Sequence, residues 1–313
     1  MATLVVALGG NAILQRGERG TAAEQRKNVD TTARQIALLV KQGHRVVVTH
    51  GNGPQVGNIM IQNEAAREQV PPMPMDIAGA ESQGMIGYMM QMYIRNRLRE
   101  MDLDIPVVTV ITQTVVDQND PAFSNPSKPV GPFYDKEWAE KRMKEAGETW
   151  IEDSGRGWRR VVPSPDPKFI VEGPSIKALI QAGHLVVASG GGGIPVIMSP
   201  AGRLSGVEAV IDKDLAAERL ASYVGADALL ILTDVPGAAL YFGTPSQRWL
   251  GRVSLAELEG YQAEGHFRKG SMGPKVEAII RFLRNGGSTG VIASLDHALP
   301  AASGEAGTVA TRT

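Results

Sequence analysis

The sequence predicts an α/β protein built on a mostly parallel sheet that helices cover on both faces. Two observations lead to this fold class. Short apolar, β-branched runs alternate with helical patterns along most of the 313 residues, which is typical of repeated strand–helix–strand units. In addition, a glycine stops a helix just before a strand at Gly43 and again at Gly183, so the same local device is used twice.

The expected elements follow in chain order from the spacing of apolar residues. Residues 24–42 place apolar side chains at helical intervals, and residues 79–99 form a long second helix. Apolar runs rich in β-branched residues predict strands. The expected strands are residues 4–8, 46–50, 107–111, 185–189, 228–232 and 290–294, and the further helices are residues 176–182, 215–224 and 275–284.

Composition excludes several classes of function. The formal net charge of −1 gives no reason to expect a nucleic-acid or membrane partner. The chain has no cysteine, which rules out disulfides, thiolate chemistry and cysteine-ligated metals, and its five histidines lack metal-ligand spacing. No signal peptide or membrane-length apolar run is evident. We therefore expect a cytoplasmic protein with no metal ligands of its own.

Residues 117–162 interrupt the alternation of strands and helices. The segment is rich in proline and carries a charged helical pattern at residues 136–147. An excursion of this length inside a compact α/β chain is usually functional. Two interpretations stay open, namely a surface insertion with its own small core around Trp138, Trp150 and Trp158, or a lid over the active site.

Two predicted strands end in corners that contain glycine and asparagine. Residues 4–8 run into Gly9-Gly10-Asn11, and residues 46–50 run into Gly51-Asn52-Gly53. A glycine at such a corner lets the backbone approach a ligand closely, and a helix that follows directs unpaired N–H groups at the ligand. Each corner is expected to open a helix, and together they predict a paired cradle for an anion.

Three lysines stand at positions that a bound anion would explain. Lys128 is held extended by the proline that follows it. Lys213 and Lys275 fall in the first turn of predicted helices, with Pro274 expected at the first helical position, and the helix dipole opposes a cation there. A polyphosphate would neutralise both the lysines and the dipole.

Two aspartates flank Lys213. Asp212 is expected to be the N-cap of the helix. Asp214 is either a plain acid that compensates the dipole or a carboxylate that orients the two helix-start lysines. The residues alone leave that choice open.

Four segments carry a resemblance to a known family, and they are Leu8-Gly9-Gly10-Asn11-Ala12, His50-Gly51-Asn52-Gly53-Pro54-Gln55, Val210-Ile211-Asp212-Lys213-Asp214 and Gly270-Ser271-Met272-Gly273-Pro274-Lys275. Together they resemble the carbamate kinases of the amino acid kinase family, and the match runs from the first strand to residues 308–311. Relatives in this family, such as acetylglutamate kinase, have a phosphate-binding lysine where this chain has Ala7, and the resemblance implies that Lys213 makes good this loss.

The resemblance implies a three-layer α/β/α sandwich with a central, mainly parallel eight-stranded sheet and a protruding lid subdomain. Residues 1–313 would form one amino acid kinase-type domain. The lobe at 1–200 would bind carbamate or carbamoyl phosphate and carry the lid at 117–162, and the lobe at 201–313 would bind the nucleotide. The implied reaction is ATP + carbamate ⇌ ADP + carbamoyl phosphate, used to form ATP in arginine or agmatine catabolism, with Mg²⁺ entering on ATP or ADP.

The resemblance also implies roles for single residues and for assembly. The resemblance places Tyr241 at the nucleotide, but Tyr241 can equally be interpreted as a residue on the face of a strand. The resemblance implies a homodimer built across the helix at 79–99, which has Met85, Met89 and Met92 on one side and further apolar residues on another. The implied catalytic residues are Lys128, Lys213, Asp214 and Lys275, those that bind the phosphoryl and carbamoyl groups are Gly9, Gly10, Asn11, Gly51, Asn52 and Gly53, and those that bind the nucleotide are Thr233, Asp234, Pro236, Gly237, Tyr241, Met272 and Gly273.

Two alternative functions stay open. Another phosphotransferase of the family, of the acetylglutamate or glutamate type, would share the nucleotide lobe but is expected to keep a lysine at position 7. A non-catalytic nucleotide-binding member of the fold is expected to lack Lys213, Asp214 or Lys275, and all three are present.

Overall fold

A computed structural model describes residues 1–15, 17–153, 155–268 and 270–313. Its centre is a sheet of eight strands in the order β15-β17-β16-β12-β1-β2-β9-β3. The strands from β16 to β3 run parallel, whereas β17 and β15 at one edge run the opposite way. The bounds are β15 Arg252–Ser254, β17 Thr308–Thr311, β16 Thr289–Ser294, β12 Ala228–Thr233, β1 Thr3–Leu8, β2 Arg45–His50, β9 Leu185–Val187 and β3 Val107–Thr109.

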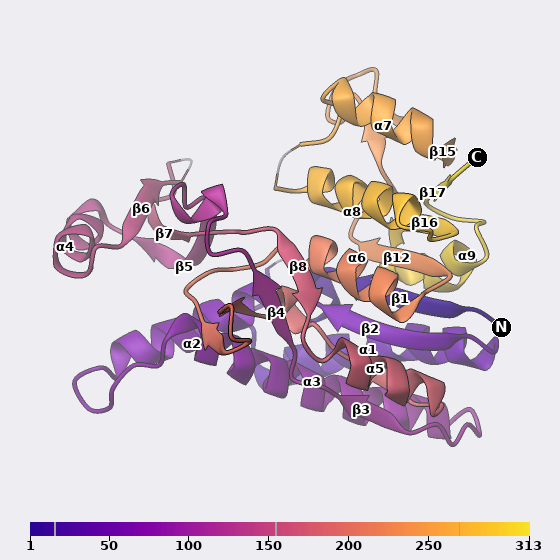
Figure 1. Cartoon of the computed structure of the whole chain (residues 1–313), viewed down its shortest axis with the longest axis horizontal. Coiled ribbons are helices and arrows are strands. Elements are labelled where there is room, and N and C mark those ends of the chain that lie inside the picture. The colour runs from indigo at the N-terminus through magenta and orange to yellow at the C-terminus, as the bar shows by residue number, and fades with distance from the viewer. Residues whose placement is uncertain (16, 154, 269) are drawn as a thin grey trace.

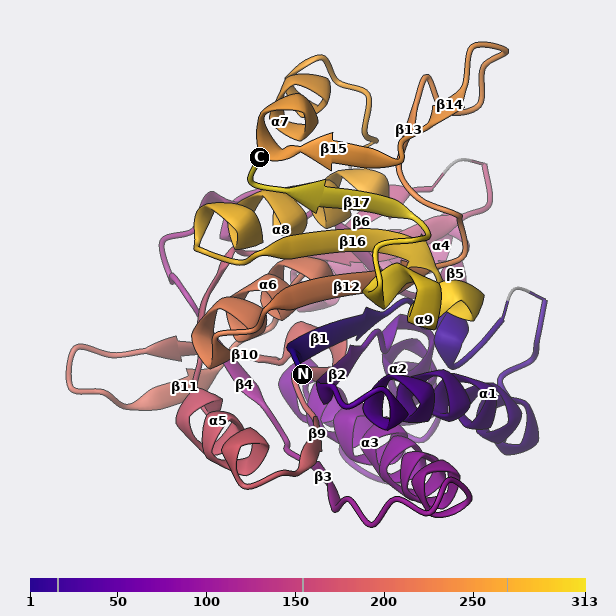
Figure 2. The ribbon, with the colours of Figure 1, turned by 90° about the vertical axis from the view of Figure 1, so that its right-hand side faces the viewer.

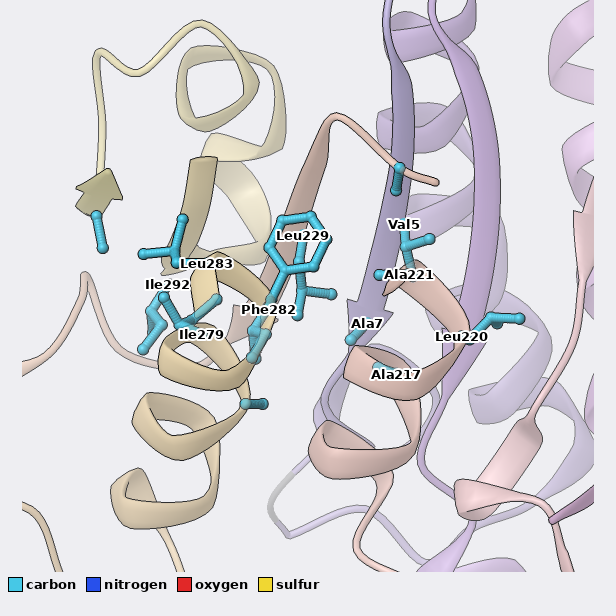
Figure 3. Close-up of a cluster of buried hydrophobic side chains, with 14 of the residues drawn as sticks. Val5, Ala7, Ala217, Leu220, Ala221, Leu229, Ile279, Phe282, Leu283 and Ile292 are labelled. Carbon is cyan, nitrogen blue, oxygen red and sulfur yellow. The ribbon is translucent and has the colours of Figure 1, made fainter. Parts of the chain in front are cut away.

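Helices cover both faces of this sheet (Figure 1, Figure 2). Successive side chains of a strand point to opposite faces, and β1 shows both cores. Val5 and Ala7 pack in a buried cluster with α6 and α8 (Figure 3), whereas Val6 and Leu8 pack in a second cluster with α1, α3 and α9. The three-layer sandwich is therefore confirmed. The helices are α1 Ala22–Lys41, α2 Gly53–Ala65, α3 Met75–Arg99, α4 Lys136–Ala146, α5 Gly173–Gln181, α6 Lys213–Val224, α7 Leu255–Ala263, α8 Met272–Arg284 and α9 Ala298–Ala302.

Some expected boundaries are wrong for local reasons. The first glycine corner opens only the 3₁₀ turn η1 (Gly10–Ala12), and α1 begins at Ala22, where Thr21 and Glu24 form a capping box. The α3 helix begins four residues before position 79, since Met75 and Ala78 are buried and extend its apolar face. Pro274 is the third residue of α8, not the first.

Short strands form a second sheet that the apolar pattern did not predict. Its order is β11-β10-β4-β8, and its strands β4 and β10 are the next strands along the chain after β3 and β9. Strands of three to five residues carry too little periodicity to be recognised in the sequence. The bounds are β4 Gln113–Val116, β8 Pro167–Ile170, β10 Ile194–Met198 and β11 Leu204–Gly206, and a separate hairpin pairs β13 Ala239–Leu240 with β14 Arg248–Trp249.

The segment at 117–162 folds as a small unit that protrudes from the sandwich (Figure 1). It contains the turn η2 (Pro121–Phe123), the antiparallel strands β5 (Lys128–Tyr134), β7 (Trp158–Val162) and β6 (Thr149–Glu152), and α4.

The protruding unit has a core of its own. The ring of Tyr134 stacks on Trp138 with centroids 5.7 Å apart and meets Trp150 edge-on at 5.4 Å. Trp150 is 8% exposed. The expected small aromatic core is therefore confirmed for these residues.

Candidate active site

The candidate site lies at the carboxyl ends of the parallel strands, where open α/β sheets bind ligands. Both glycine corners lie there, because β1 and β2 are neighbours in register. The Gly51 N–H donates to the Leu8 carbonyl at 3.1 Å and the Gly9 N–H to the Leu232 carbonyl at 2.8 Å. These bonds continue the sheet beyond its strands and hold both corners in place.

The two corners touch each other and one of the predicted lysines. A Cβ atom on Gly51 would lie 3.4 Å from the Gly10 nitrogen and 3.4 Å from Cδ of Lys213. Within the described part of the chain, the backbone N–H groups of Gly10, Asn11, Asn52 and Gly53 have no protein acceptor. Unpaired N–H groups that meet beside a lysine form a cradle for an anion.

Lys213 and Lys275 converge on one carboxylate. Lys213 Nζ lies 2.5 Å from Asp214 Oδ1, and Lys275 Nζ lies 2.9 Å from Asp214 Oδ2. The two lysines come from the first turns of α6 and α8, and the side chain of Asp214 is only 4% exposed. Of the two interpretations of Asp214, the geometry fits the orienting carboxylate.

The charge state of Asp214 follows from this arrangement. Burial opposes ionisation, but the positive charges of Lys213 and Lys275 and their hydrogen bonds outweigh it, so the pKa of Asp214 lies below its usual value. An ionised Asp214 holds the two ammonium groups side by side in spite of their mutual repulsion. The lysines therefore stand ready for a further anion.

Lys128 is the first residue of β5 and reaches the same helix start. Its Nζ lies 3.2 Å from Asp212 Oδ2, while Asp212 Oδ1 accepts the Asp214 N–H at 3.0 Å. Asp212 is the N-cap of α6, as expected. The protruding unit thus places a cation at the start of α6, the helix whose first residue is Lys213.

Three cavities surround these residues. The largest, about 620 Å³, is lined by Gly10, Asn11, Lys213 and Lys275. One of about 140 Å³ lies under the protruding unit and is lined by Asn52, Gly53, Lys128, Gly191 and Gly193 among others. A third of about 180 Å³ adjoins the largest, with Thr233, Asp234 and Lys275 lining both.

The residues expected to bind a nucleotide divide into two groups. Thr233, Asp234, Gly237 and Met272 line the 180 Å³ cavity. Pro236, Tyr241 and Gly273 do not line it, and Tyr241 lies after β13, 54% exposed, with its ring 4.6 Å from that of His266. Their role stays a prediction. Phe242, His266 and Arg268 line the cavity and were missed, since no pattern in the sequence marks them.

His50 was also missed. It ends β2 and is 1% exposed, and its Nδ1 lies 3.0 Å from the Gly51 carbonyl oxygen. Burial, aided by the charge of Lys213, lowers its pKa to about 4. A neutral imidazole must then carry its proton on Nδ1, because a carbonyl oxygen can only accept.

The described residues contain no cluster of three or more histidine and acidic side chains that could hold a metal ion. Asp234 and Asp296 nevertheless line the 620 Å³ cavity with the lysines. Asp234 is tied in place by the Asn11 amide at 3.1 Å. Carboxylates of this kind suit Mg²⁺, which keeps much of its water shell and binds phosphates.

No helix in the described ranges is both long and apolar enough to cross a membrane.

Comparison with known proteins identifies relatives over the full length of the chain. The model of the amino acid kinase family matches residues 2–294. The carbamate kinase of Thermococcus kodakarensis is 58% identical, with all of both chains covered, and that of Pyrococcus horikoshii is 57% identical, with 98% of each covered. The solved structure of carbamate kinase from Giardia lamblia bound to AMP-PNP is 47% identical, with a TM-score of 0.95 over 99% of this chain and 98% of that one.

Proposed function

This chain belongs to the amino acid kinase family, and from that membership and its site we propose that it catalyses ATP + carbamate ⇌ ADP + carbamoyl phosphate. Its full-length relatives carry the name carbamate kinase, and it is an enzyme of the same phosphotransferase class. The proposal rests mainly on one observation, the pair of lysines that a buried aspartate holds beside two glycine corners.

Phosphoryl transfer asks the protein for positioning and charge neutralisation and for little covalent work. The terminal oxygen of ADP attacks phosphorus, and the bond from phosphorus to the carbamoyl oxygen breaks, with its electron pair leaving on carbamate. Lys213 and Lys275 stabilise the equatorial oxygens in the transition state. Asp214 orients both lysines, and the free N–H groups of Gly10 and Asn52 hold the phosphoryl group between the corners. Gly9, Asn11, Gly51 and Gly53 complete this cradle.

The small cavity under the protruding unit is assigned to the carbamoyl group. Lys128 and Asn52 line it, and a cation brought from above neutralises the leaving carboxylate. The unit at 117–162 acts as a lid that excludes water from the labile acyl phosphate. The lobe at 1–200 binds carbamoyl phosphate, and the lobe at 201–313 binds the nucleotide.

ADP is assigned to the two adjoining cavities of the other lobe. Its phosphates lie beside Lys213 and Lys275, and its base enters the cavity lined by Met272 and Phe242. Asp234 and Asp296 would hold a Mg²⁺ ion bound with the nucleotide, and the ion would supply further charge neutralisation at the phosphates. Pro236, Gly237, Tyr241 and Gly273 are assigned to the borders of this region.

Position 7 argues against other kinases of the family. Ala7 is fully buried and packs in the same cluster as Ala217 of α6. Lys213, in the first turn of α6, lies against Gly51, and we assign to it the role that a lysine of the first strand has in acetylglutamate kinase. A non-catalytic role is disfavoured by the intact Lys213–Asp214–Lys275 arrangement. We further propose a cytoplasmic homodimer that forms ATP in arginine or agmatine catabolism.

The test is ATP formation by pure protein from ADP, Mg²⁺ and carbamoyl phosphate, with other acyl phosphates as controls. Lys275→Ala serves as the matched variant. We expect it to lower turnover at least about 100-fold while the fold persists, since it removes charge stabilisation of the transition state. No ATP from the unaltered protein, or near-normal turnover in Lys275→Ala, would contradict the proposal.

A further inference from the structure

The carboxamide of Asn52 is fixed by a serine from α3. Asn52 Nδ2 lies 2.8 Å from Ser82 Oγ, and Ser82 Oγ lies 2.7 Å from the Gly79 carbonyl oxygen. Ser82 is fully buried. These two contacts determine which way the amide faces.

A proton must lie between Ser82 Oγ and the Gly79 carbonyl oxygen, since two oxygens at 2.7 Å otherwise repel each other. A carbonyl oxygen carries no hydrogen, so the serine hydroxyl is the donor. Having donated its only proton, Ser82 Oγ can only accept from Asn52. The NH₂ group of Asn52 therefore faces Ser82, and Oδ1 faces the other way.

The rest of the surroundings hold the amide flat and leave Oδ1 free. A Cβ atom on Gly191 would lie 2.4 Å from Oδ1 and 2.2 Å from Nδ2, so only a glycine fits beside the amide plane. Within the described ranges, Oδ1 accepts no hydrogen bond from the protein. Asn52 lines the 140 Å³ cavity that also contains Lys128.

Few polar side chains reach this cavity. Besides Asn52 and Lys128, Arg159 lines it, and its guanidinium donates to the Gly131 carbonyl and pairs with Asp153. Val56, Met75, Val210 and other apolar residues make up much of the remainder. The cavity thus offers one oriented acceptor, Asn52 Oδ1, and two cationic groups, of which the Arg159 guanidinium is already held by Gly131 and Asp153.

We propose that Asn52 Oδ1, turned into the cavity by Ser82, accepts a hydrogen bond from the NH₂ group of the substrate and so selects carbamoyl phosphate over acetyl phosphate. The carbamoyl group has an N–H donor and a carbonyl acceptor, which match Asn52 Oδ1 and the Lys128 ammonium. An acetyl group places a methyl where the donor should be and leaves Oδ1 buried and unpaired. Sites built to bond a substrate N–H reject analogues that lack it more strongly than apolar pockets reject a change in size.

Ser82 is a positioning residue in this scheme, and the inference rests on the proposed function. The bonds that form and break are the same for both acyl phosphates. The ADP oxygen bonds to phosphorus, and carbamate or acetate leaves with the electron pair. The difference between the two substrates therefore reports on the acyl cavity.

The experiment measures kcat/KM for ATP formation from carbamoyl phosphate and from acetyl phosphate, and takes their ratio. We expect Ser82→Ala to lower the ratio at least about tenfold, because the freed amide no longer presents Oδ1. Asn52→Leu removes the acceptor itself and should lower the ratio further, because the use of carbamoyl phosphate should fall more than the use of acetyl phosphate. Ser82→Thr retains the hydroxyl and should keep the ratio of the unaltered protein.

Melting temperature and KM for ADP separate this effect from general damage, and both should stay near their original values. Equal losses with both acyl phosphates, or an unchanged ratio in Ser82→Ala and Asn52→Leu, would overturn the inference while leaving the proposed function in place. Failure of the unaltered protein to form ATP from carbamoyl phosphate is a different result, since it overturns the proposed function itself.

Discussion

At the scale of a single residue, the buried His50 side chain makes the stability of the folded protein depend on pH. Its imidazole is buried and neutral, with a pKa of about 4 against an ordinary value of 6.5. The unfolded chain binds a proton on this histidine below pH 6.5, whereas the folded chain binds it only near pH 4. Between these values the unfolded state holds more protons, so folding becomes less favourable as the pH falls.

We expect the free energy of unfolding to fall by about 3 kcal/mol from this group as the pH is lowered from 6.5 to 4. The contribution of His50 to the free energy of unfolding is fully present above pH 6.5, and it is lost below pH 4. Urea unfolding at several pH values measures it. His50→Asn, whose amide can donate to the Gly51 carbonyl, should remove this part of the slope, whereas the exposed His297→Asn should not. Identical slopes in the unaltered protein and His50→Asn would refute the expectation.

The sequence could predict some of the site residues because they conflict with local rules. Lys213 and Lys275 stand at helix starts where a cation is disfavoured, and the structure brings both to Asp214. Ser82 and His50 conflict with no local rule. Ser82 matters only because it meets a side chain 30 residues away, and such a meeting is decided by the fold.

At the scale of elements, the alternation of strands and helices was predictable wherever an element was long or fully buried. The strands β1, β2 and β12 read as near-continuous apolar runs because helices cover both faces. The sheet β11-β10-β4-β8 was not predictable, because its strands are short and one side of it is exposed in places. Strand ends were also hard to predict. The strand expected at residues 185–189 ends at Val187 in the structure, and Ser189 takes a left-handed conformation.

The unit at 117–162 provides the element-scale prediction. Lys128 is its contact with α6, through Asp212, and it lies by the cavity assigned to the carbamoyl group. Lys128→Ala should therefore weaken the use of carbamoyl phosphate much more than the binding of ADP, which is assigned to the other lobe. Steady-state kinetics and ADP titration measure the two effects. Lys144→Ala, an exposed change on α4, is the matched control.

Hydrogen exchange tests whether the same unit closes as a lid. Exchange in residues 117–162 should slow when ADP and carbamoyl phosphate are both present, because closure removes backbone groups from water. If exchange ignores the ligands and Lys128→Ala leaves the kinetics with carbamoyl phosphate intact, the unit is a surface insertion with an aromatic core.

At the scale of the whole molecule, the parallel sheet explains how distant segments come together. β1 lies between β12 and β2 and runs parallel to both, so the corners after residues 8, 50 and 233 meet at the carboxyl ends of these strands. Residue patterns alone predicted a mostly parallel sheet covered on both faces, whereas the number of strands came from the family resemblance. Strand order depends on crossovers between distant segments, which no local pattern encodes.

Assembly is the remaining question at this scale, and α3 bears on it. The helix is apolar on more than one side. Ile86, Met89 and Ile94 pack into the main body, as core residues do. Ile77, Met85 and Tyr88 lie on another side and are 42%, 38% and 60% exposed. Exposed apolar side chains at helical spacing suit a contact between two copies of the chain.

We expect a homodimer, so light scattering at micromolar concentration should give twice the chain mass of 33.4 kDa. Met85→Glu combined with Tyr88→Glu should shift the mass toward the monomer, because a dimer interface would have to bury two unpaired charges from each chain. Lys41→Glu, an exposed change on α1, should leave the dimer intact. A monomeric mass for the unaltered chain would refute the dimer. A dimer that resists the double change would place its interface on a surface other than the exposed side of α3.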